Sequence, residues 1–331
     1  MNKARRSGKA TKRIAIYMYV LIVLMCLLVV SSYTWFSLSQ TPRVSDMYMF
    51  INTQSGLELS ADPLAEEWTL RLDFRDLVDV ETELRPVTWS DRDQQFYAAK
   101  YGIDGRLLPY SSWTPLTDEY NANRDNASGY YAKMTFFARS GQAENVFLSP
   151  AVEVDEGIKG SGTYVIGTPV WNSEEIIHYN GGQGAECAVR IGIRVTPVDL
   201  NGEPTGEEST FFIYEPNSDL HPDGGRGYVP TPSIHQAGTL VPQERLILQS
   251  ASQWTEADPV QRSVVIKELG EFQDKVILFS LNPGEMVMID LYVWLEGQDM
   301  DCTNKITEAQ ILASIQFASD TGSQSGMQPI E

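Results

Sequence analysis

Apolar and polar residues alternate with a period of two along much of the chain. From 68 to 74 every second residue is apolar, and from 187 to 196 the apolar positions alternate with Ala188, Arg190, Gly192, Arg194 and Thr196. Such alternation is typical of a β-strand that buries one of its faces. Further strands are predicted at 44–52, 57–60, 133–138, 161–167, 209–215, 244–250 and 311–317.

A tight turn is predicted between two apolar stretches near the C-terminal end. The stretches 276–281 and 286–295 flank Asn282-Pro283-Gly284-Glu285, and Pro followed by Gly at the central positions is typical of a type II turn. We therefore expect a β-hairpin. Its second strand should direct one set of side chains to the core (Val287, Ile289, Leu291, Val293, Leu295) and the other set away from it (Met288, Asp290, Tyr292, Trp294).

The region 75–130 departs from this pattern. Ser90, with Asp93 three residues later, predicts the start of a short helix that runs to about Tyr101. The rest of the region is aromatic, polar and rich in turn residues, so we expect a loop and short-helix insertion. About ten short strands with turns between them predict an antiparallel β-sandwich over 44–318, followed by a flexible polar tail at 319–331.

The N-terminus predicts export. Residues 1–13 contain six basic residues and no acidic one, and an unbroken apolar run follows from Ile14 to Val30. A basic stretch before an apolar segment stays in the cytoplasm, so the rest of the chain should lie outside. The segment 14–36 reaches the roughly 20 residues that span a bilayer, whereas a cleaved signal peptide has a shorter apolar core of about 7–15 residues. The sequence leaves both open: a single-pass membrane protein with an extracellular body, or a protein secreted after cleavage.

The charge of the chain narrows the choice of partners. The formal net charge is −19, and without the six basic residues of 1–13, the basic cytoplasmic segment, the remaining chain carries about −25. Such an excess of negative charge disfavours nucleic acid as a partner. The expected partners are the membrane, through 14–36, and other surface proteins or further copies of the chain.

Few motifs indicate chemistry. The sequence contains no HExxH, G-x-S-x-G, P-loop, G-x-G-x-x-G or CxxC motif, so we expect neither an enzyme nor a cofactor. A calcium site is one interpretation of the cluster Glu296, Asp299 and Asp301, because Ca²⁺ prefers carboxylate oxygens. The alternative is a turn held by hydrogen bonds from Asp and Asn side chains to the backbone.

Two cysteines lie in the part expected to be exported. Cys187 and Cys302 form a candidate disulfide, because exported proteins meet an oxidising environment. The alternative is a pair of separate thiols, each buried as a small apolar side chain.

Two classes of function remain. The first is a structural or interaction protein of the cell surface or extracellular matrix, which could polymerise if the segment 44–51 adds as a strand to a neighbouring molecule. The second is a glycan-binding module or glycan-active enzyme whose insertion carries aromatic side chains on which sugars stack. The alternative role for these aromatic residues is packing of the insertion onto the body; the residues are Trp89, Tyr110, Trp113, Tyr130 and Tyr131.

Two parts of the sequence resemble known groups of exported proteins. The basic start, the apolar segment and the following SSYTWFS resemble the exported TasA/camelysin group of surface and matrix-fibre proteins of Gram-positive bacteria. The stretch LYVWLEGQDMDCTNKI looks like a strand-and-loop signature of exported clostridial proteins. The resemblance covers about 14–52 and 286–317 and implies a jelly-roll-like sandwich with a surface or assembly role. The chain departs from the group in lacking the usual small-residue cleavage site, and it has no metallopeptidase motif.

Overall fold

Two compact units make up the chain, Met1–Thr41 and Pro42–Glu331. The computed structural model describes residues 16–29, 44–54, 56–73, 77, 83–90, 94–98, 100, 112–118, 129–155, 158–167, 170–172, 175–177, 185–217, 263–266, 268–270, 275–297, 299, 302, 306 and 309–321.

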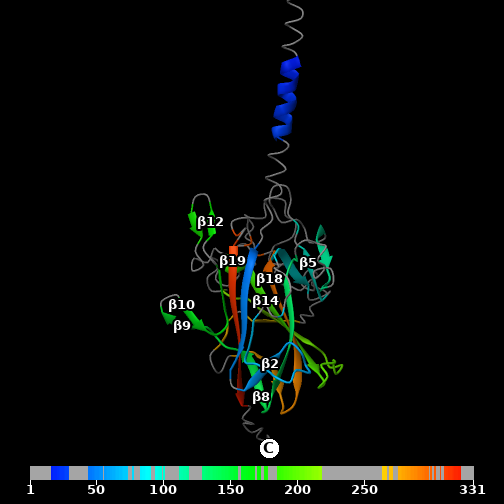
Figure 1. Ribbon diagram of the computed structural model, residues 1–331, viewed down its shortest axis with the longest axis vertical. Helices are drawn as coiled ribbons and strands as arrows, with labels where there is room; N and C mark the ends of the chain where they lie inside the picture. Colours follow the sequence, from blue (N-terminus) through cyan, green and yellow to red (C-terminus); the bar gives the residue numbers. More distant parts are fainter. Residues whose placement is uncertain are drawn as a thin grey trace, which may run out of the picture. The chain divides into compact units, whose positions relative to one another are not determined.

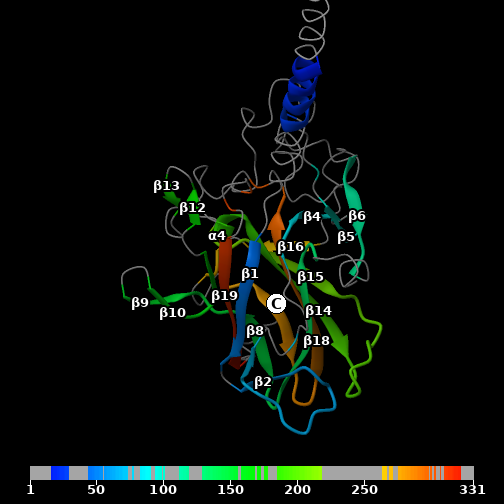
Figure 2. The same ribbon diagram turned by 45° about the horizontal axis from the view of Figure 1, so that its top comes forward.

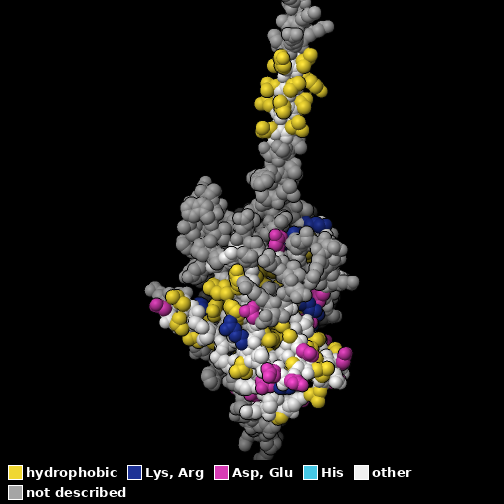
Figure 3. All heavy atoms as spheres, viewed as in Figure 1, with side chains coloured by type: hydrophobic (Ala, Val, Ile, Leu, Met, Phe, Trp, Pro, Cys, Tyr) yellow, Lys and Arg dark blue, Asp and Glu magenta, His cyan; other side chains and the backbone are white. Residues whose placement is uncertain are grey.

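The described part of the first unit is a helix at 16–29, and every residue of this helix is exposed. Its side chains are almost all apolar, as the yellow spheres in Figure 3 show. Within the described residues, no helix combines the length and the apolar character needed to cross a bilayer.

The second unit is mostly β, with one sheet of six strands and one of nine (Figure 1). In the six-stranded sheet β11 (Tyr164–Gly167) pairs with β19, and the other strands follow the order β17 (Ile277–Leu281), β8 (Glu144–Leu148), β19 (Ala309–Thr321), β1 (Val44–Thr53) and β3 (Arg71–Asp73). Two small pairs stand apart: β9 (Val152–Asp155) with β10 (Ile158–Ser161), and β12 (Val170–Asn172) with β13 (Glu175–Ile177).

The nine-stranded sheet is built around β18. Its main path has the order β16 (Ser263–Ile266), β15 (Thr210–Tyr214), β14 (Val189–Val198), β18 (Met286–Glu296), β4 (Pro86–Ser90), β5 (Gln95–Ala98) and β6 (Thr114–Leu116). On the side of β18 away from β14, β7 (Ala132–Ser140) pairs with residues 286–293, and β2 (Leu57–Ser60) pairs with β7. The short helix α4 (Ala185–Ala188) immediately precedes β14.

Both sheets are mixed, which corrects the expectation of purely antiparallel pairing. The pairs β1–β19, β15–β16 and β18–β4 are parallel. Parallel neighbours require a long connection. For β1 and β19 nearly the whole body of the chain supplies it, because these strands lie close to its two ends.

The largest hydrophobic core takes side chains from both sheets. Met49 and Ile51 of β1 lie in the same buried cluster as Ile191 of β14 and Leu291 of β18. On β18 the predicted core-facing set is confirmed, because all five of its residues belong to this cluster. We call the side of the nine-stranded sheet that faces this cluster its inner face and the opposite side its outer face.

The predicted turn at 282–285 forms, but the predicted hairpin does not. Gly284 has a positive φ of 84°, as a type II turn requires at this position, and the Glu285 N–H donates to the Asn282 carbonyl at 2.9 Å. The flanking strands then part: β17 pairs with β8 in one sheet, while β18 pairs with β14 in the other. A type II turn splays the strands that it joins, whereas hairpins favour the mirror-image turns whose twist matches their strands. The turn therefore connects the two sheets.

The insertion contains strands where a helix was expected. β5 pairs with β4 and β6 and extends the nine-stranded sheet (Figure 2). Phe96 and Ala98 of β5 are buried while Gln95 and Tyr97 are half-buried, which is the alternation of a strand. The helix predicted from Ser90 to about Tyr101 is therefore wrong in the described part of this range, because partners in the sheet outweigh a local capping signal.

Most other predicted strands are confirmed, with small shifts at their ends. β1, β2, β7, β15 and β19 match the predictions closely, and β19 continues to Thr321, beyond the predicted start of the tail. The strand predicted at 244–250 lies outside the described residues.

Candidate functional site

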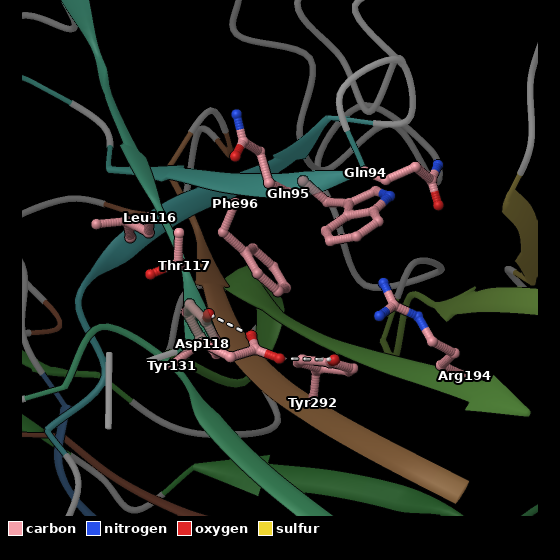
Figure 4. A pocket seen from close by; sticks show the side chains of 10 residues that line it. Gln94, Gln95, Phe96, Leu116, Thr117, Asp118, Tyr131, Arg194 and Tyr292 are labelled. Atoms are coloured by element: carbon pink, nitrogen blue, oxygen red, sulfur yellow. Dashed lines mark hydrogen bonds between the residues drawn. The ribbon is translucent and has the colours of Figure 1, made fainter. Parts of the chain in front are cut away.

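A pocket opens on the outer face of the nine-stranded sheet. Its volume is about 260 Å³, and Figure 4 shows the side chains that line it: Trp89, Gln94, Gln95, Phe96, Leu116, Thr117, Asp118, Tyr131, Arg194 and Tyr292. These residues come from five strands and from the chain next to them, so the sheet itself assembles the pocket.

The order of the strands brings the lining residues together. Trp89 of β4 is opposite Phe96 of β5, which is opposite Leu116 of β6. Tyr131 immediately precedes β7. Tyr292 of β18 and Arg194 of β14 belong to two neighbouring strands of the same sheet. Tyr292 contacts Phe96 of β5, and Arg194 lies over the ring of Trp89.

Aromatic rings form the wall of the pocket and a second hydrophobic core behind it. The ring centroids of Phe96 and Tyr131 lie 4.2 Å apart, and those of Phe96 and Tyr292 lie 5.6 Å apart. Trp89 packs against Phe211 of β15 at 4.5 Å. This second core contains residues from the insertion and from the outer face of the central strands. The insertion therefore covers the part of the outer face around Tyr292 and Trp294.

Asp118 is held by three donors. The Tyr131 hydroxyl donates to its Oδ1 at 2.7 Å, the Lys133 ammonium donates to Oδ2 at 2.8 Å, and the Tyr292 hydroxyl donates to Oδ2 at 3.3 Å. Burial by itself would raise the pKa of Asp118, but the hydrogen bonds from Lys133 and Tyr131 together outweigh it and hold the pKa below its ordinary value. Asp118 is therefore an ionised, fixed carboxylate.

The other titrating groups around Asp118 keep their protons. Burial raises the pKa of Tyr131, and the hydrogen bond to Asp118 raises it further. Burial also raises the pKa of Tyr292, to about 12. Burial would lower the pKa of Lys133, but its hydrogen bond to Asp118 and the charges around it outweigh this effect and raise the pKa. Around neutral pH each group has one protonation state.

Lys133 also connects the pocket to Asp290. Its Nζ lies 3.4 Å from Asp290 Oδ2, and the Thr135 hydroxyl donates to Asp290 Oδ1 at 2.5 Å. The Lys133 ammonium thus forms ion pairs with two carboxylates, those of Asp118 and Asp290.

Arg194 holds its guanidinium among aromatic rings. The guanidinium carbon lies 5.3 Å from the ring centroid of Phe211, 5.4 Å from that of Trp89 and 5.6 Å from that of Tyr292. In Figure 4 it points toward the side of the pocket on which Gln94 lies. Among the described residues Arg194 has no hydrogen bond or ion pair.

A second charged cluster lies around Arg190, four residues earlier on β14. Its Nη2 lies 2.6 Å from Asp299 Oδ2 and 3.3 Å from Glu215 Oε1, and all three side chains are fully buried. Its Nη1 donates to the carbonyls of Cys187 and Val189. This arrangement ties α4, β14 and the segment after β18 together.

The proposed calcium ligands have other partners in the structure. Asp299 pairs with Arg190, and Glu296 accepts a hydrogen bond from the Trp294 indole at 3.2 Å. Glu296 is completely buried, and Asp301 lies outside the described residues. Among the described residues no group of three or more His, Cys, Asp or Glu side chains is placed to hold a metal ion. The backbone N–H of Asp299 donates to the Glu296 carbonyl at 3.0 Å, whereas the side-chain hydrogen bonds of the alternative interpretation stay a prediction.

The disulfide expected between Cys187 and Cys302 is absent from the structure. Both residues are buried thiols, which is the alternative that the sequence left open. Both lie next to the Arg190 cluster, since Arg190 binds the Cys187 carbonyl and the Cys302 N–H donates to the Asp299 carbonyl. Burial of a small apolar thiol is sufficient to explain both positions.

The aromatic residues of the insertion do not form an exposed platform. Trp89, Trp113 and Tyr131 are buried and Tyr130 is half-buried, while Tyr110 lies outside the described residues. Packing onto the body, the alternative reading, thus describes most of them. Trp89 and Tyr131 nevertheless line the pocket.

Sequence reasoning missed Asp118, Lys133 and Arg194. Arg194 gave a weak signal, because a charged residue alternated with apolar ones on a predicted strand. Asp118 and Lys133 gave none, since 15 positions separate them and only the sheet brings them to 2.8 Å.

Comparison with protein-family models gave no matching family, and comparisons with curated proteins and with solved structures gave no match. The resemblance to the TasA/camelysin group therefore stays a prediction.

Proposed function

We propose that this chain is an exported interaction protein, which its N-terminal segment carries to or holds at the cell surface and whose β body acts by binding. The main observation in support of this proposal is the helix at 16–29. Its apolar residues are exposed on every side, whereas a helix that is apolar all round is stable only inside a protein core or a bilayer. The basic residues before it favour a body outside the cell.

The body in this proposal is a β-sandwich of the jelly-roll-like kind. The core that takes residues from both sheets supports this architecture. β1 has β19 and β3 as neighbours on its two sides, so polymerisation by addition of this strand would require it to leave its own sheet.

The protonation states in the pocket support binding in place of catalysis. General acid–base catalysis needs a group whose pKa lies near the working pH. The pKa of Asp118 is lowered, while those of Lys133 and Tyr131 are raised and that of Tyr292 is about 12. None of these four groups changes its charge near neutral pH.

Protease accessibility tests the topology. The full chain is expressed in a Gram-positive host, the cell wall is removed, and protease is added to the intact protoplasts. We expect digestion of the body, and protection of residues 44–331 would contradict the proposal. N-terminal sequencing of the protein in the membrane and medium fractions then distinguishes an anchor from a cleaved signal peptide.

Glycan recognition is a second candidate function. The observation in its favour is the pocket, in which Trp89 and Tyr131, both predicted as stacking residues, lie beside Asp118 and Arg194.

A further inference from the structure

Two loops at one end of the body hold leucine side chains in solvent. Leu64, in the loop between β2 and β3, is 67% exposed, and Leu200, in the loop between β14 and β15, is 71% exposed. The two loops are in contact, because a Cβ added to Gly202 would lie 2.6 Å from the Pro63 side chain. Figures 1 and 2 show the loops side by side. The two leucines therefore belong to one surface, and neighbouring exposed apolar groups mark interaction sites more often than scattered ones do.

Both loops have a fixed shape. Asp199 Oδ1 accepts hydrogen bonds from the backbone N–H groups of Glu203 and Asn201, both at 2.9 Å, and these bonds hold the pKa of Asp199 below its ordinary value. In the other loop the Trp68 indole donates to the Ala65 carbonyl at 3.1 Å. Loops that are already ordered lose little conformational entropy when they bind a partner.

A third hydrophobic cluster, around Phe137, supports the two loops. Trp68 of the first loop packs against it, and a Cβ on Gly202 of the second loop would lie 3.2 Å from the Phe137 ring. Leu64 and Leu200 belong to none of the three hydrophobic clusters of the described residues. Packing of the core therefore does not account for these two leucines.

The surface around the leucines is acidic. The two loops, 61–70 and 199–209, contain seven carboxylates and no Lys, Arg or His. All seven are exposed: Asp62, Glu66, Glu67, Asp199, Glu203, Glu207 and Glu208. The neighbouring cation Arg139 lies over the Trp68 ring at 4.1 Å and pairs with Glu58 at 3.0 Å. In Figure 3 carboxylates and apolar side chains lie together at the lower right of the body.

The combination of leucines and carboxylates restricts the partner. A metal ion would use the carboxylates and leave the leucines in water. A second copy of the chain would bring equally acidic loops, and an anionic lipid surface would also be repelled. A basic protein segment with interspersed apolar residues satisfies both groups, because its Lys or Arg side chains pair with carboxylates and its apolar side chains cover the leucines.

We propose that the two loops form a docking surface for a basic segment of a partner protein, whose apolar side chains cover Leu64 and Leu200 and whose Lys or Arg side chains pair with the carboxylates around them. The proposal rests on the binding role proposed for the body and names the class of partner. Failure of the docking experiment leaves the topology experiment intact. Protection of the body from protease would contradict the exported role whatever binds to the loops.

The test uses the full chain in nanodiscs of zwitterionic lipid, with empty nanodiscs as the background. Three labelled octapeptides are titrated at low salt and followed by fluorescence anisotropy. One alternates Lys with Leu, one alternates Lys with Ser and keeps only the charge, and one alternates Glu with Leu and keeps only the apolar side chains. We expect binding of the Lys–Leu peptide and at least tenfold weaker binding of the other two. Binding should also weaken as salt is added, because exposed charges are screened.

Serine variants locate the site. Leu64→Ser combined with Leu200→Ser should weaken binding of the Lys–Leu peptide by about tenfold or more, because two apolar contacts are lost. Val154→Ser combined with Ile158→Ser is the matched control, because these side chains are 69% and 54% exposed on the β9–β10 pair, which lies away from both loops in Figures 1 and 2. The control should bind as the wild type does. Thermal unfolding confirms that both variants fold.

Three results would overturn the proposal: no binding of the Lys–Leu peptide at millimolar concentration, equal binding of either other peptide, or equal loss in the control variant. Light scattering over a range of protein concentrations examines a second copy of the chain as the occupant. Self-association that the substitutions at Leu64 and Leu200 abolish would assign the surface to that second copy and would also overturn the proposal.

Discussion

Two arginines on the same strand of this protein differ in burial and in their partners. Arg190 and Arg194 both belong to β14 and, four residues apart, both project from its outer face. Arg190 is fully buried and paired with Glu215 and Asp299. Arg194 is half-buried, lies among three aromatic rings, and has no ion pair with the described residues.

The difference shows that one strand face carries a buried, paired guanidinium at one end and a partly exposed guanidinium among aromatic rings at the other. A buried guanidinium must be matched by carboxylates, because the removal of a charge from water is costly without a partner. A partly exposed guanidinium keeps some of its hydration and can exchange it for a ligand. Gly192, between the two arginines, leaves room for the aromatic residues that separate their surroundings.

The largest expected effect comes from Arg190. Arg190→Met leaves Glu215 and Asp299 buried without their cation, so we expect a loss of about 3–5 kcal/mol in the free energy of unfolding. Arg194→Met should cost less than about 1 kcal/mol, the value of a partly exposed contact between a cation and aromatic rings. Urea unfolding of the unit Pro42–Glu331, which contains both sheets and both cores, measures both.

The double variant Arg190→Met with Asp299→Asn sharpens this result. If the buried charge causes the loss, the second substitution should recover part of it, and the two effects should be clearly non-additive. Equal losses for Arg190→Met and Arg194→Met would contradict the distinction between the two surroundings.

A smaller loss is expected from the residue between them. A Cβ on Gly192 would lie 2.6 Å from the Phe211 ring and 3.0 Å from the Trp294 ring, which are fixed in the second core. Gly192→Ala should therefore destabilise the unit by about 1–3 kcal/mol through overpacking. Gly141 is the matched control, because nothing lies within 4 Å of an added Cβ there, and Gly141→Ala should be neutral or slightly stabilising. Equal unfolding midpoints for the two variants would refute this prediction.

The sequence predicted the inner face of the sheet better than the outer face. On β18 the alternation of apolar and polar residues placed Ile289, Leu291 and Val293 in the core, because burial on one face leaves a period of two in the sequence. The same pattern marked Asp290, Tyr292 and Trp294 as outward, but period two cannot tell whether water or another part of the chain covers that side. Here the insertion covers Tyr292 and Trp294.

The candidate site could be predicted only in part. Trp89 and Tyr131 were recognised as candidates by residue type, whereas Asp118 and Arg194 were not. Their proximity follows from the order of the strands β14, β18, β4, β5 and β6, and no local spacing in the sequence contains that order. The type II turn at Gly284 shows the same difference between local and long-range structure. Its local conformation was predictable from the sequence, but the separation of its two strands into different sheets was not.

Removal of one hydroxyl beside Asp118 should have a smaller effect than either substitution above. Tyr131→Phe keeps the ring and removes the donor that lies 2.7 Å from Asp118, so we expect a loss of about 1 kcal/mol in the free energy of unfolding. Tyr292→Phe removes a longer hydrogen bond, 3.3 Å, to the same carboxylate and should cost less. Urea unfolding compares the two variants, and a larger loss for Tyr292→Phe would show that the shorter bond is not the stronger one.

The smallest expected effect is a dependence of stability on pH through Asp118. The pKa of Asp118 is lower in the folded protein than its ordinary value of about 3.9, so the folded state binds its proton less readily than the unfolded state. Its contribution to stability is therefore complete above about pH 4 and is lost as the pH falls through the lower, folded pKa. The side chain is 44% exposed, so the contribution should be about 0.2–1 kcal/mol, typical of a solvent-screened pair.

Asp118→Asn isolates this contribution, because the amide has the same shape and does not titrate. Unfolding of the wild-type unit and of the variant is measured between pH 3 and pH 8, and the difference should be constant above about pH 5 and shrink below pH 4. Lys133 does not disturb this window, since its raised pKa means that its own contribution is lost only at alkaline pH. A difference that grows as the pH falls would show that Asp118 is protonated more readily in the folded protein. Asp118 would then no longer be the fixed anion that holds Lys133.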